Sequence, residues 1–134
     1  MGKARVSQAA TGITLDAGAL IALERGDKRM IALLNEGLIL RRAFRIPAGV
    51  VAQTWRDGRT QATLTRFLRS DRVEIAPLDE HVARACGELC RISGTSDVID
   101  ASVVLLARAR RDVIVTADPA DLRRLDPKAL IVPI

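Results

Sequence analysis

The sequence predicts an α/β domain, a three-layer α/β/α sandwich around a central, mainly parallel sheet. Short apolar runs alternate along the chain with helical segments of about 8 to 15 residues. This alternation indicates a parallel sheet that is covered by helices on both faces. With 134 residues, of which 49% are hydrophobic, the chain is long enough for one domain with a sizeable core.

The first half of the chain contains two predicted strands and four predicted helices. Gly26 ends the first helix, and Asp57 and Gly58 end the third. Pro47 suits the first turn of that third helix, because proline has no N–H to lose there. In order, the expected elements are strand 13–15, helix 17–24, helix 28–40, strand 44–46, helix 48–55 and the amphipathic helix 59–70.

The second half continues the alternation. Asp79 is the expected N-cap of a helix, and the helix that follows is the most hydrophobic in the chain. The expected elements are strand 72–78, helix 79–93, helix 97–110, strand 112–116, a short helical turn at 117–125 and strand 129–134. Residues 1–11 lack the apolar stretch of a signal peptide and are expected to form a flexible tail before the folded domain at 12–134.

Composition restricts the classes of function. The formal net charge is +5, and the excess is mostly arginine, which fits a polyanionic partner; a merely solvated surface is the alternative. Aromatic residues make up 2% of the chain, which disfavours a face of stacked aromatics for binding single strands. No apolar run reaches the length of a membrane span, about 18 residues, so we expect a cytoplasmic protein without membrane contact.

The two cysteines, Cys86 and Cys90, are four residues apart on one helical face. Such a pair supplies only two metal ligands, and no histidine is placed to add a third. We therefore expect buried, reduced thiols, which suits a cytosolic chain.

Four aspartates each have a structural explanation when considered singly. Asp16, Asp97 and Asp118 precede helices and are possible N-caps, and Asp118 is followed by Pro119 in the manner of a capped helix start. Asp100 lies in a first helical turn, where the backbone dipoles favour negative charge.

Considered together, the same aspartates predict a metal site. Asp16 and Asp118 both follow strands, at the carboxyl edge where parallel sheets bind ligands, and Asp97 and Asp100 share a helical face. Carboxylates gathered in this way require protons or a cation to offset their repulsion. Ligand sets made of oxygen alone select Mg²⁺ or Mn²⁺.

The sequence contains no rival catalytic nucleophile. No serine–histidine–acid set, phosphate-binding glycine loop or nucleotide-binding fingerprint is present, and His81 is expected to be exposed. A water molecule activated by a metal is therefore the expected attacking group.

The motifs resemble those of PIN-domain ribonucleases, particularly the VapC toxins of toxin–antitoxin pairs. LDAGALIALERGD is similar to the family's strand–Asp–helix opening, TSDVIDASVVLLAR carries its acid at Asp100, and IVTADPADL carries its Thr-x-Asp. The resemblance extends from Ile13 to the C-terminus. It implies an α/β/α fold, a Mg²⁺ or Mn²⁺ cofactor, endonucleolytic cleavage of RNA such as tRNA, a homodimer and a cognate VapB-like antitoxin.

One position departs from the family pattern. The family's second motif normally supplies a glutamate, whereas the matching stretch IPAGVVAQTWRDG has Gln53. Glutamine keeps a neutral oxygen for a metal or its waters but removes one negative charge, so weaker metal binding is expected. Asp97 is a candidate to restore that charge, and Asp57 is a less favoured one.

The mechanistic hypothesis assigns a role to each residue. Asp16, Asp100 and Asp118 hold the metal, and Asp97 orients or deprotonates the attacking water. Thr116 and Gln53 do not hold the metal directly; Thr116 holds a carboxylate and Gln53 offers its oxygen to the metal's waters. The arginines expected to position the RNA backbone are Arg25, Arg56 and Arg59.

Three alternatives stay open. A receiver-type signalling domain also gathers acids on a parallel sheet, but it needs a lysine after a late strand that is missing here. A degenerate PIN domain that only binds RNA or protein is consistent with Gln53. A metal-dependent phosphatase for small molecules is disfavoured by the arginine bias.

Overall fold

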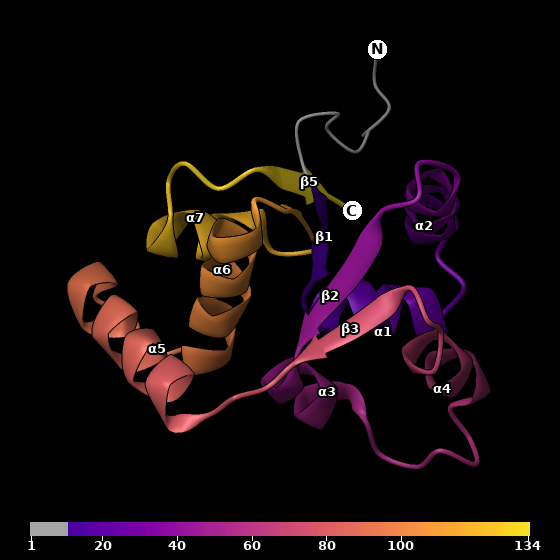
Figure 1. Cartoon of the computed structure of the whole chain (residues 1–134), viewed down its shortest axis with the longest axis horizontal. Helices are drawn as coiled ribbons and strands as arrows, with labels where there is room; N and C mark the ends of the chain where they lie inside the picture. The colour runs from indigo at the N-terminus through magenta and orange to yellow at the C-terminus, as the bar shows by residue number, and fades with distance from the viewer. Residues whose placement is uncertain (1–10) are drawn as a thin grey trace.

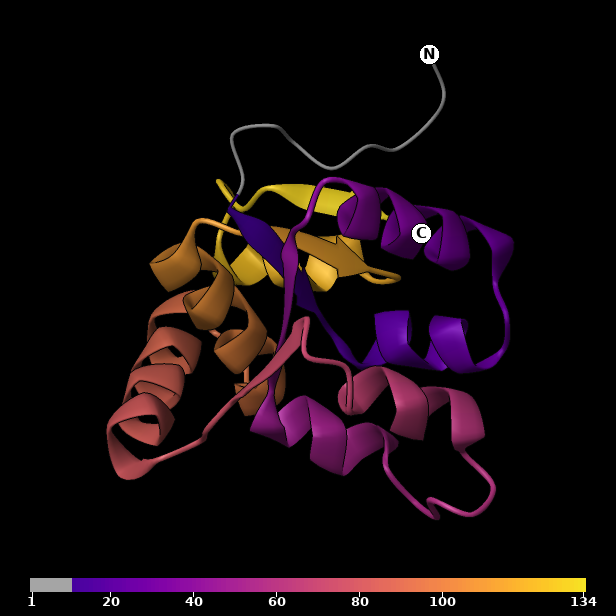
Figure 2. The same cartoon turned by 45° about the vertical axis from the view of Figure 1, so that its right-hand side comes forward.

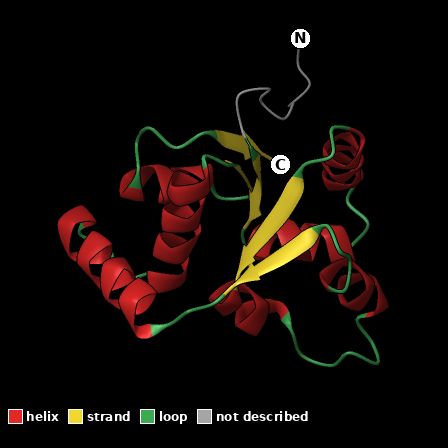
Figure 3. Cartoon of the chain, in the orientation of Figure 1, coloured by secondary structure: helices red, strands yellow, loops and turns green. Residues whose placement is uncertain are grey.

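The computed structural model describes residues 11–134, which fold into five strands and seven helices (Figures 1 and 3). The strands are β1 (Gly12–Leu15), β2 (Ala43–Pro47), β3 (Val73–Ala76), β4 (Val113–Thr116) and β5 (Ile131–Pro133). The helices are α1 (Ala17–Glu24), α2 (Lys28–Ile39), α3 (Ala48–Thr54), α4 (Ala62–Leu68), α5 (Glu80–Ser93), α6 (Val98–Arg110) and α7 (Pro119–Leu125). The predicted tail at 1–11, apart from Thr11, lies outside the described residues.

All five strands are parallel and lie in the order β3-β2-β1-β4-β5. In β1, Ile13 is in register with Phe44 of β2 and with Val113 of β4. The chain builds the sheet outward from β1 in one direction and then returns to place β4 on the other side of β1. This reversal puts the topological switch point between β1 and β4, where sheets of this kind bind ligands.

Helices cover both faces of the sheet, so the predicted three-layer α/β/α architecture is confirmed. Figure 1 shows α5, α6 and α7 on one side of the strands and α1, α2 and α4 on the other, and the turned view in Figure 2 agrees. Helix α6 packs directly on β1, β2 and β4 and is covered in turn by α5 and α7. No helix within residues 11–134 is long and apolar enough to cross a membrane.

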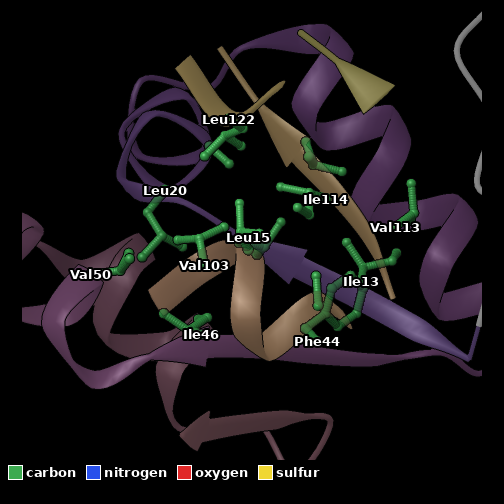
Figure 4. Close-up of a cluster of buried hydrophobic side chains, with 14 of the residues drawn as sticks. Ile13, Leu15, Leu20, Phe44, Ile46, Val50, Val103, Val113, Ile114 and Leu122 are labelled. Carbon is green, nitrogen blue, oxygen red and sulfur yellow. The ribbon is translucent and has the colours of Figure 1, made fainter. Parts of the chain in front are cut away.

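The core is aliphatic, as the composition predicts. Figure 4 draws part of it, including Leu15 from β1, Leu20 from α1 and Val103 from α6, all of which are fully buried. Phe44 is the one aromatic among the largest fully buried side chains of the described residues. Cys86 and Cys90 are buried free thiols, and burial raises the pKa of the Cys86 thiol, so the expectation for this pair is confirmed.

The predicted placement of Pro47 and one predicted helix start are wrong for local reasons. Pro47 does not stand in the first turn of α3 but ends β2, in register with Ala76, and its extended backbone makes it the N-cap. The helix expected from residue 59 begins at Ala62, because the backbone oxygen of Asp57 accepts hydrogen bonds from the N–H groups of Thr60 and Gln61. These bonds form a tight turn ahead of the helix.

A buried charge cluster ties the strands together at the amino end of the sheet. The Asp112 carboxylate, with a side chain 0% exposed, accepts a 2.6 Å hydrogen bond from Arg45 Nη1 and a 2.8 Å bond from Thr14 Oγ1. Glu74 extends the cluster, since it contacts Arg45 at 3.5 Å and Arg110 of α6 at 2.7 Å. Removing one partner from such a buried pair leaves an uncompensated charge, which is strongly destabilising.

Gly12 makes room for this cluster. A Cβ at this position would lie 2.5 Å from Arg45 Nη1, 2.8 Å from the Ala43 carbonyl oxygen and 2.9 Å from Asp112 Oδ1. Real Cβ atoms do not approach other atoms so closely, and two of these neighbours are held by the ion pair. Any side chain at Gly12 must therefore displace the Arg45–Asp112 contact.

We predict that Gly12→Ala lowers the free energy of unfolding by about 1–3 kcal/mol, because it overpacks the ion pair. Gly87→Ala is the matched control, since a Cβ there, within α5, meets no atom within 4 Å. That control should raise stability by about 0.5–1 kcal/mol through helix propensity. Urea unfolding measures both, and a Gly12→Ala midpoint equal to that of the parent protein would contradict the account.

Candidate functional site

The site is built at the carboxyl ends of β1 and β4, the two strands at the switch point. Asp16 follows Leu15 directly and is the N-cap of α1. Asp118 follows β4 by two residues and precedes α7, whose first residue is Pro119. Because β1 and β4 are adjacent and parallel, their two aspartates belong to the same edge of the sheet.

Asp16 is buried, at 6% exposed, and both of its carboxylate oxygens accept hydrogen bonds. Oδ1 accepts a 2.9 Å bond from the backbone N–H of Ala19, and Oδ2 accepts a 2.5 Å bond from Thr116 Oγ1. Burial raises the pKa of the Asp16 carboxyl, and the nearby charge of Asp118 raises it further, while the two hydrogen bonds oppose the shift. Asp16 is therefore both the N-cap of α1 and a member of the candidate site.

Thr116 connects the two acidic segments. Its buried hydroxyl donates to Asp16 and accepts a 2.9 Å hydrogen bond from the backbone N–H of Asp118. Asp118 stands at the N-cap position of α7, but its side chain makes no capping bond and is exposed. The carboxylate of Asp118 is thus not used by the helix that it precedes.

Asp97 and Asp100 belong to the start of α6. Asp97 is the N-cap, and its Oδ1 accepts hydrogen bonds from the N–H groups of Ile99 at 3.1 Å and Asp100 at 2.9 Å. Asp100 is half-buried. Its burial, followed by the charges of Asp97, Asp16 and Asp121, raises the pKa of Asp100 to about 7. This effect shows that acids from β1, α6 and α7 lie near one another.

Asp121 is a member of this acidic group that the sequence reasoning missed. It lies in the first turn of α7 and contributes to the raised pKa of Asp100. The signal for it was its spacing, three residues after Asp118 at a helix start, which turns both side chains to related faces. Acids in the first turn commonly stabilise a helix, so nothing in the sequence indicated that Asp121 belongs to a functional site.

Gln53 lies near the end of α3 and is exposed. One turn earlier, a Cβ on Gly49 would lie 2.4 Å from Ile99 Cδ1, so α3 closely approaches the start of α6. Gln53 follows Gly49 by four residues and therefore lies on the same side of α3. Asp57, the less favoured substitute, is occupied by contacts of 2.9 Å to the Arg59 N–H and 3.3 Å to Arg59 Nε.

The three predicted RNA-positioning arginines lie in another part of the surface. Arg25 is the C-cap of α1, whose eight residues rise about 12 Å from the end that carries Asp16. Arg56 donates to the carbonyl oxygens of Ala52 and Trp55, and the side chain of Arg59, 91% exposed, pairs with Asp57. None of these three lines the cavity beside Asp100, whereas Arg124 of α7 does.

The acidic group has the chemistry of a site for a hard divalent cation. None of the ion pairs within residues 11–134 involves Asp16, Asp100 or Asp118, so no basic side chain offsets their charge. Carboxylate oxygens are the ligands that Mg²⁺ and Mn²⁺ prefer. However, no three acidic, histidine or cysteine side chains of the described chain are already gathered so that they could hold an ion. The donor types fit, and binding requires the side chains to turn toward one another.

Comparison with known proteins identifies one family by sequence. The family model of the PIN domain matches residues 13–127. A search among curated proteins finds no match.

Solved structures share the fold at low sequence identity. VapBC2 from Rickettsia felis, bound to a DNA fragment from its promoter, matches with a TM-score of 0.65 at 18% identity, over 91% of this chain and 98% of that chain. FitAcB from Neisseria gonorrhoeae matches with a TM-score of 0.62 at 19% identity, over 90% of this chain and 96% of that chain. PAE2754 from Pyrobaculum aerophilum matches with a TM-score of 0.60 at 18% identity, over 92% of both chains.

The raised pKa of Asp100 predicts a pH dependence of stability. The folded protein keeps the proton on Asp100 up to about pH 7, whereas the unfolded chain releases it near the ordinary aspartate pKa of 3.8. The folded state therefore binds more protons between these values, and the free energy of unfolding falls as the pH rises through them. Asp100→Asn should remove this loss and stabilise the metal-free protein at pH 8 by about 1–2 kcal/mol, after allowance for solvent screening.

Urea unfolding in EDTA at about pH 5 and pH 8 measures this effect. If Asp100→Asn and the parent protein lose the same stability between the two values, Asp100 does not experience the environment described here.

Proposed function

Because the chain belongs to the PIN domain family, we propose that it is a metal-dependent endoribonuclease of the VapC type, held inactive by a cognate antitoxin. PIN domains are generally nucleases. RNA as the substrate and Mg²⁺ or Mn²⁺ as the cofactor are part of this proposal. The proposed site of action is the cytoplasm.

The observation that carries the proposal is an acidic group without basic partners at the switch point. Burial and neighbouring acids raise the pKa of Asp100 to about 7, and Asp16 is influenced in the same direction by burial and by Asp118. Electrostatic repulsion of this kind is costly in a folded protein unless it serves a ligand. A divalent cation would offset the repulsion between these carboxylates and is also the cofactor that the proposed nuclease requires.

Each side chain has a role in the proposed mechanism. Asp16, Asp100 and Asp118 hold the cation, which supplies charge that lowers the pKa of water and offsets charge on the scissile phosphate. Thr116 keeps Asp16 in one orientation through its 2.5 Å hydrogen bond. Asp97 makes both capping bonds through Oδ1 and lies next to Asp100, and its proposed role is to orient or deprotonate the attacking water.

The proposal of an antitoxin partner rests on the assemblies in which the structural neighbours were solved. Among the similar solved structures are VapBC2, FitAcB and FitAB, and the VapBC2 and FitAB structures contain DNA. On this chain, α1 and α2 expose Ile21, Ile31, Leu38 and Ile39, and Trp55 is exposed beyond α3. Exposed apolar side chains on neighbouring helices are typical of partner surfaces.

A homodimer is also part of the proposal. Strand β3 is at one edge of the sheet, and Ile75 within it and Leu78 just after it are exposed, as is Val98 at the start of α6. Exposed apolar residues at an unpaired edge favour association with another chain.

A catalytically degenerate PIN domain is the second candidate function, and Gln53 is the observation that favours it. With glutamine at this position, the site has one charge fewer than the family pattern. Such a domain would bind RNA or a protein partner without cleaving RNA.

The nuclease proposal predicts cleavage of total RNA with Mg²⁺ or Mn²⁺ and none in EDTA. Asp16→Asn and Asp100→Asn should each lower the cleavage rate by about 100-fold or more, since each removes a charge that holds the cation. Asp79→Asn is the matched control, because Asp79 is also an N-cap, accepting from the Val82 N–H at 2.9 Å, but on α5 away from the site. Metal-independent cleavage, or equal rates for all three variants, would refute the mechanism.

Gln53→Glu should tighten Mn²⁺ binding by roughly 10-fold, because it adds a carboxylate at the position of the family's second motif. Isothermal titration calorimetry measures the dissociation constant directly. An unchanged value would show that this side chain does not reach the cation, and that the second motif is misplaced on α3.

A further inference from the structure

A cavity of about 530 Å³ lies beside the acidic group, between the α5–α6 loop, the first turn of α6 and α7. Thr95 and Ser96 line it from the loop, Asp97 and Asp100 from the start of α6, and Asp121 and Arg124 from α7. Asp100 belongs both to this cavity and to the group formed with Asp16. A molecule bound in the cavity would therefore be next to the place where the cation is proposed to bind.

Arg124 is the only basic residue among those that line this cavity. It takes part in none of the ion pairs and hydrogen bonds found within residues 11–134, although three carboxylates line the same space. By contrast, Arg108 pairs with Asp126, and Arg110 pairs with Glu74. The guanidinium of Arg124 is thus available to a ligand.

The helix that carries Arg124 is firmly attached to the core. Leu122 and Leu125 of α7 are buried, so the orientation of the helix is fixed. Asp121 and Arg124 are three residues apart and both line the cavity, while Arg123 does not. Two adjacent arginines on one helix therefore differ in whether they face the cavity.

We infer that Arg124 binds a backbone phosphate of the RNA next to the scissile one, and that the cavity holds the attached nucleotide. This inference rests on the proposed function. An arginine fork matches the geometry of a phosphate, and the cavity has a volume suited to a small ligand. Thr95 belongs to the same lining, and its buried hydroxyl has no hydrogen-bond partner in the described chain.

A phosphate contact outside the reacting centre positions RNA without reading its sequence. The loss of Arg124 should therefore weaken binding of all RNA sequences alike and raise KM, with kcat nearly unchanged. Arg25, Arg56 and Arg59, the arginines predicted to position the RNA backbone, do not line this cavity. Those three remain candidates for contacts farther along the strand.

The test compares Arg124→Gln with Arg123→Gln, which removes the same charge from the neighbouring position. Binding of a fluorescent single-stranded RNA is measured by anisotropy in Mg²⁺ at several salt concentrations. Both variants also carry Asp16→Asn, so that the RNA is not cleaved during the measurement. Arg124→Gln should weaken binding by about 3- to 10-fold and lower the salt slope by about 0.7, whereas Arg123→Gln should change affinity by less than about twofold. Arg124→Lys should recover part of the loss, since it restores the charge without the fork.

Equal effects of the two glutamine variants, with RNA cleavage by the parent protein intact, would overturn this inference and leave the nuclease proposal standing. A specific effect of Arg124→Gln on binding, with no cleavage by the parent protein, would support the phosphate contact and refute the nuclease. Absence of RNA binding by the Asp16→Asn protein, together with absence of cleavage by the parent protein, would overturn both.

Discussion

The buried carboxylate of Asp16 joins the two halves of the sheet, and the arrangement of the candidate site depends on it. It caps α1 through the Ala19 N–H, and it accepts a hydrogen bond from Thr116 at the end of β4. These contacts hold the first helix and the β4–α7 connection at one edge of the sheet. Both oxygens accept from neutral donors, and none of the ion pairs within residues 11–134 involves Asp16, so the carboxylate is fixed in place without a basic partner. The charge of Asp118 raises the pKa of Asp16, and the charge of Asp16 raises the pKa of Asp100.

The two ends of the sheet use charge in opposite ways. At the amino end, Asp112, Arg45 and Glu74 form a paired cluster, and even a glycine is required to make room for it. At the carboxyl end, neighbouring aspartates raise the pKa of Asp100 and of Asp16, and no ion pair of the described residues supplies a basic partner to either. Paired charges at one end are compatible with a purely structural role. Unpaired charges at the other end reduce stability, a departure from local consistency that is expected at functional sites.

The fold and the acidic edge were predictable because both follow from local patterns combined with one topological rule. Apolar runs located the strands, and the rule that parallel sheets bind ligands at their carboxyl ends selected Asp16 and Asp118 from sixteen acidic residues. Arg124 and Asp121 were not predictable in the same way. Their proximity to Asp100 depends on how α7 packs against α6 and the α5–α6 loop, and no local signal in PADLRRL specifies that packing. Arg25, Arg56 and Arg59 were predicted to position the RNA, but sequence position says little about where a long surface side chain lies.

The central claim is that Asp16, Asp100 and Asp118 converge on a single divalent cation, although no three acids of the described chain are gathered around an ion site as the side chains now lie. The most direct measurement is a crystal structure with Mn²⁺, in which anomalous scattering locates the ion. The account predicts a peak at the carboxyl ends of β1 and β4, ligated by Asp16 and Asp100, with Asp118 turned toward it. No peak at this edge at saturating Mn²⁺, with the aspartates apart, would contradict it.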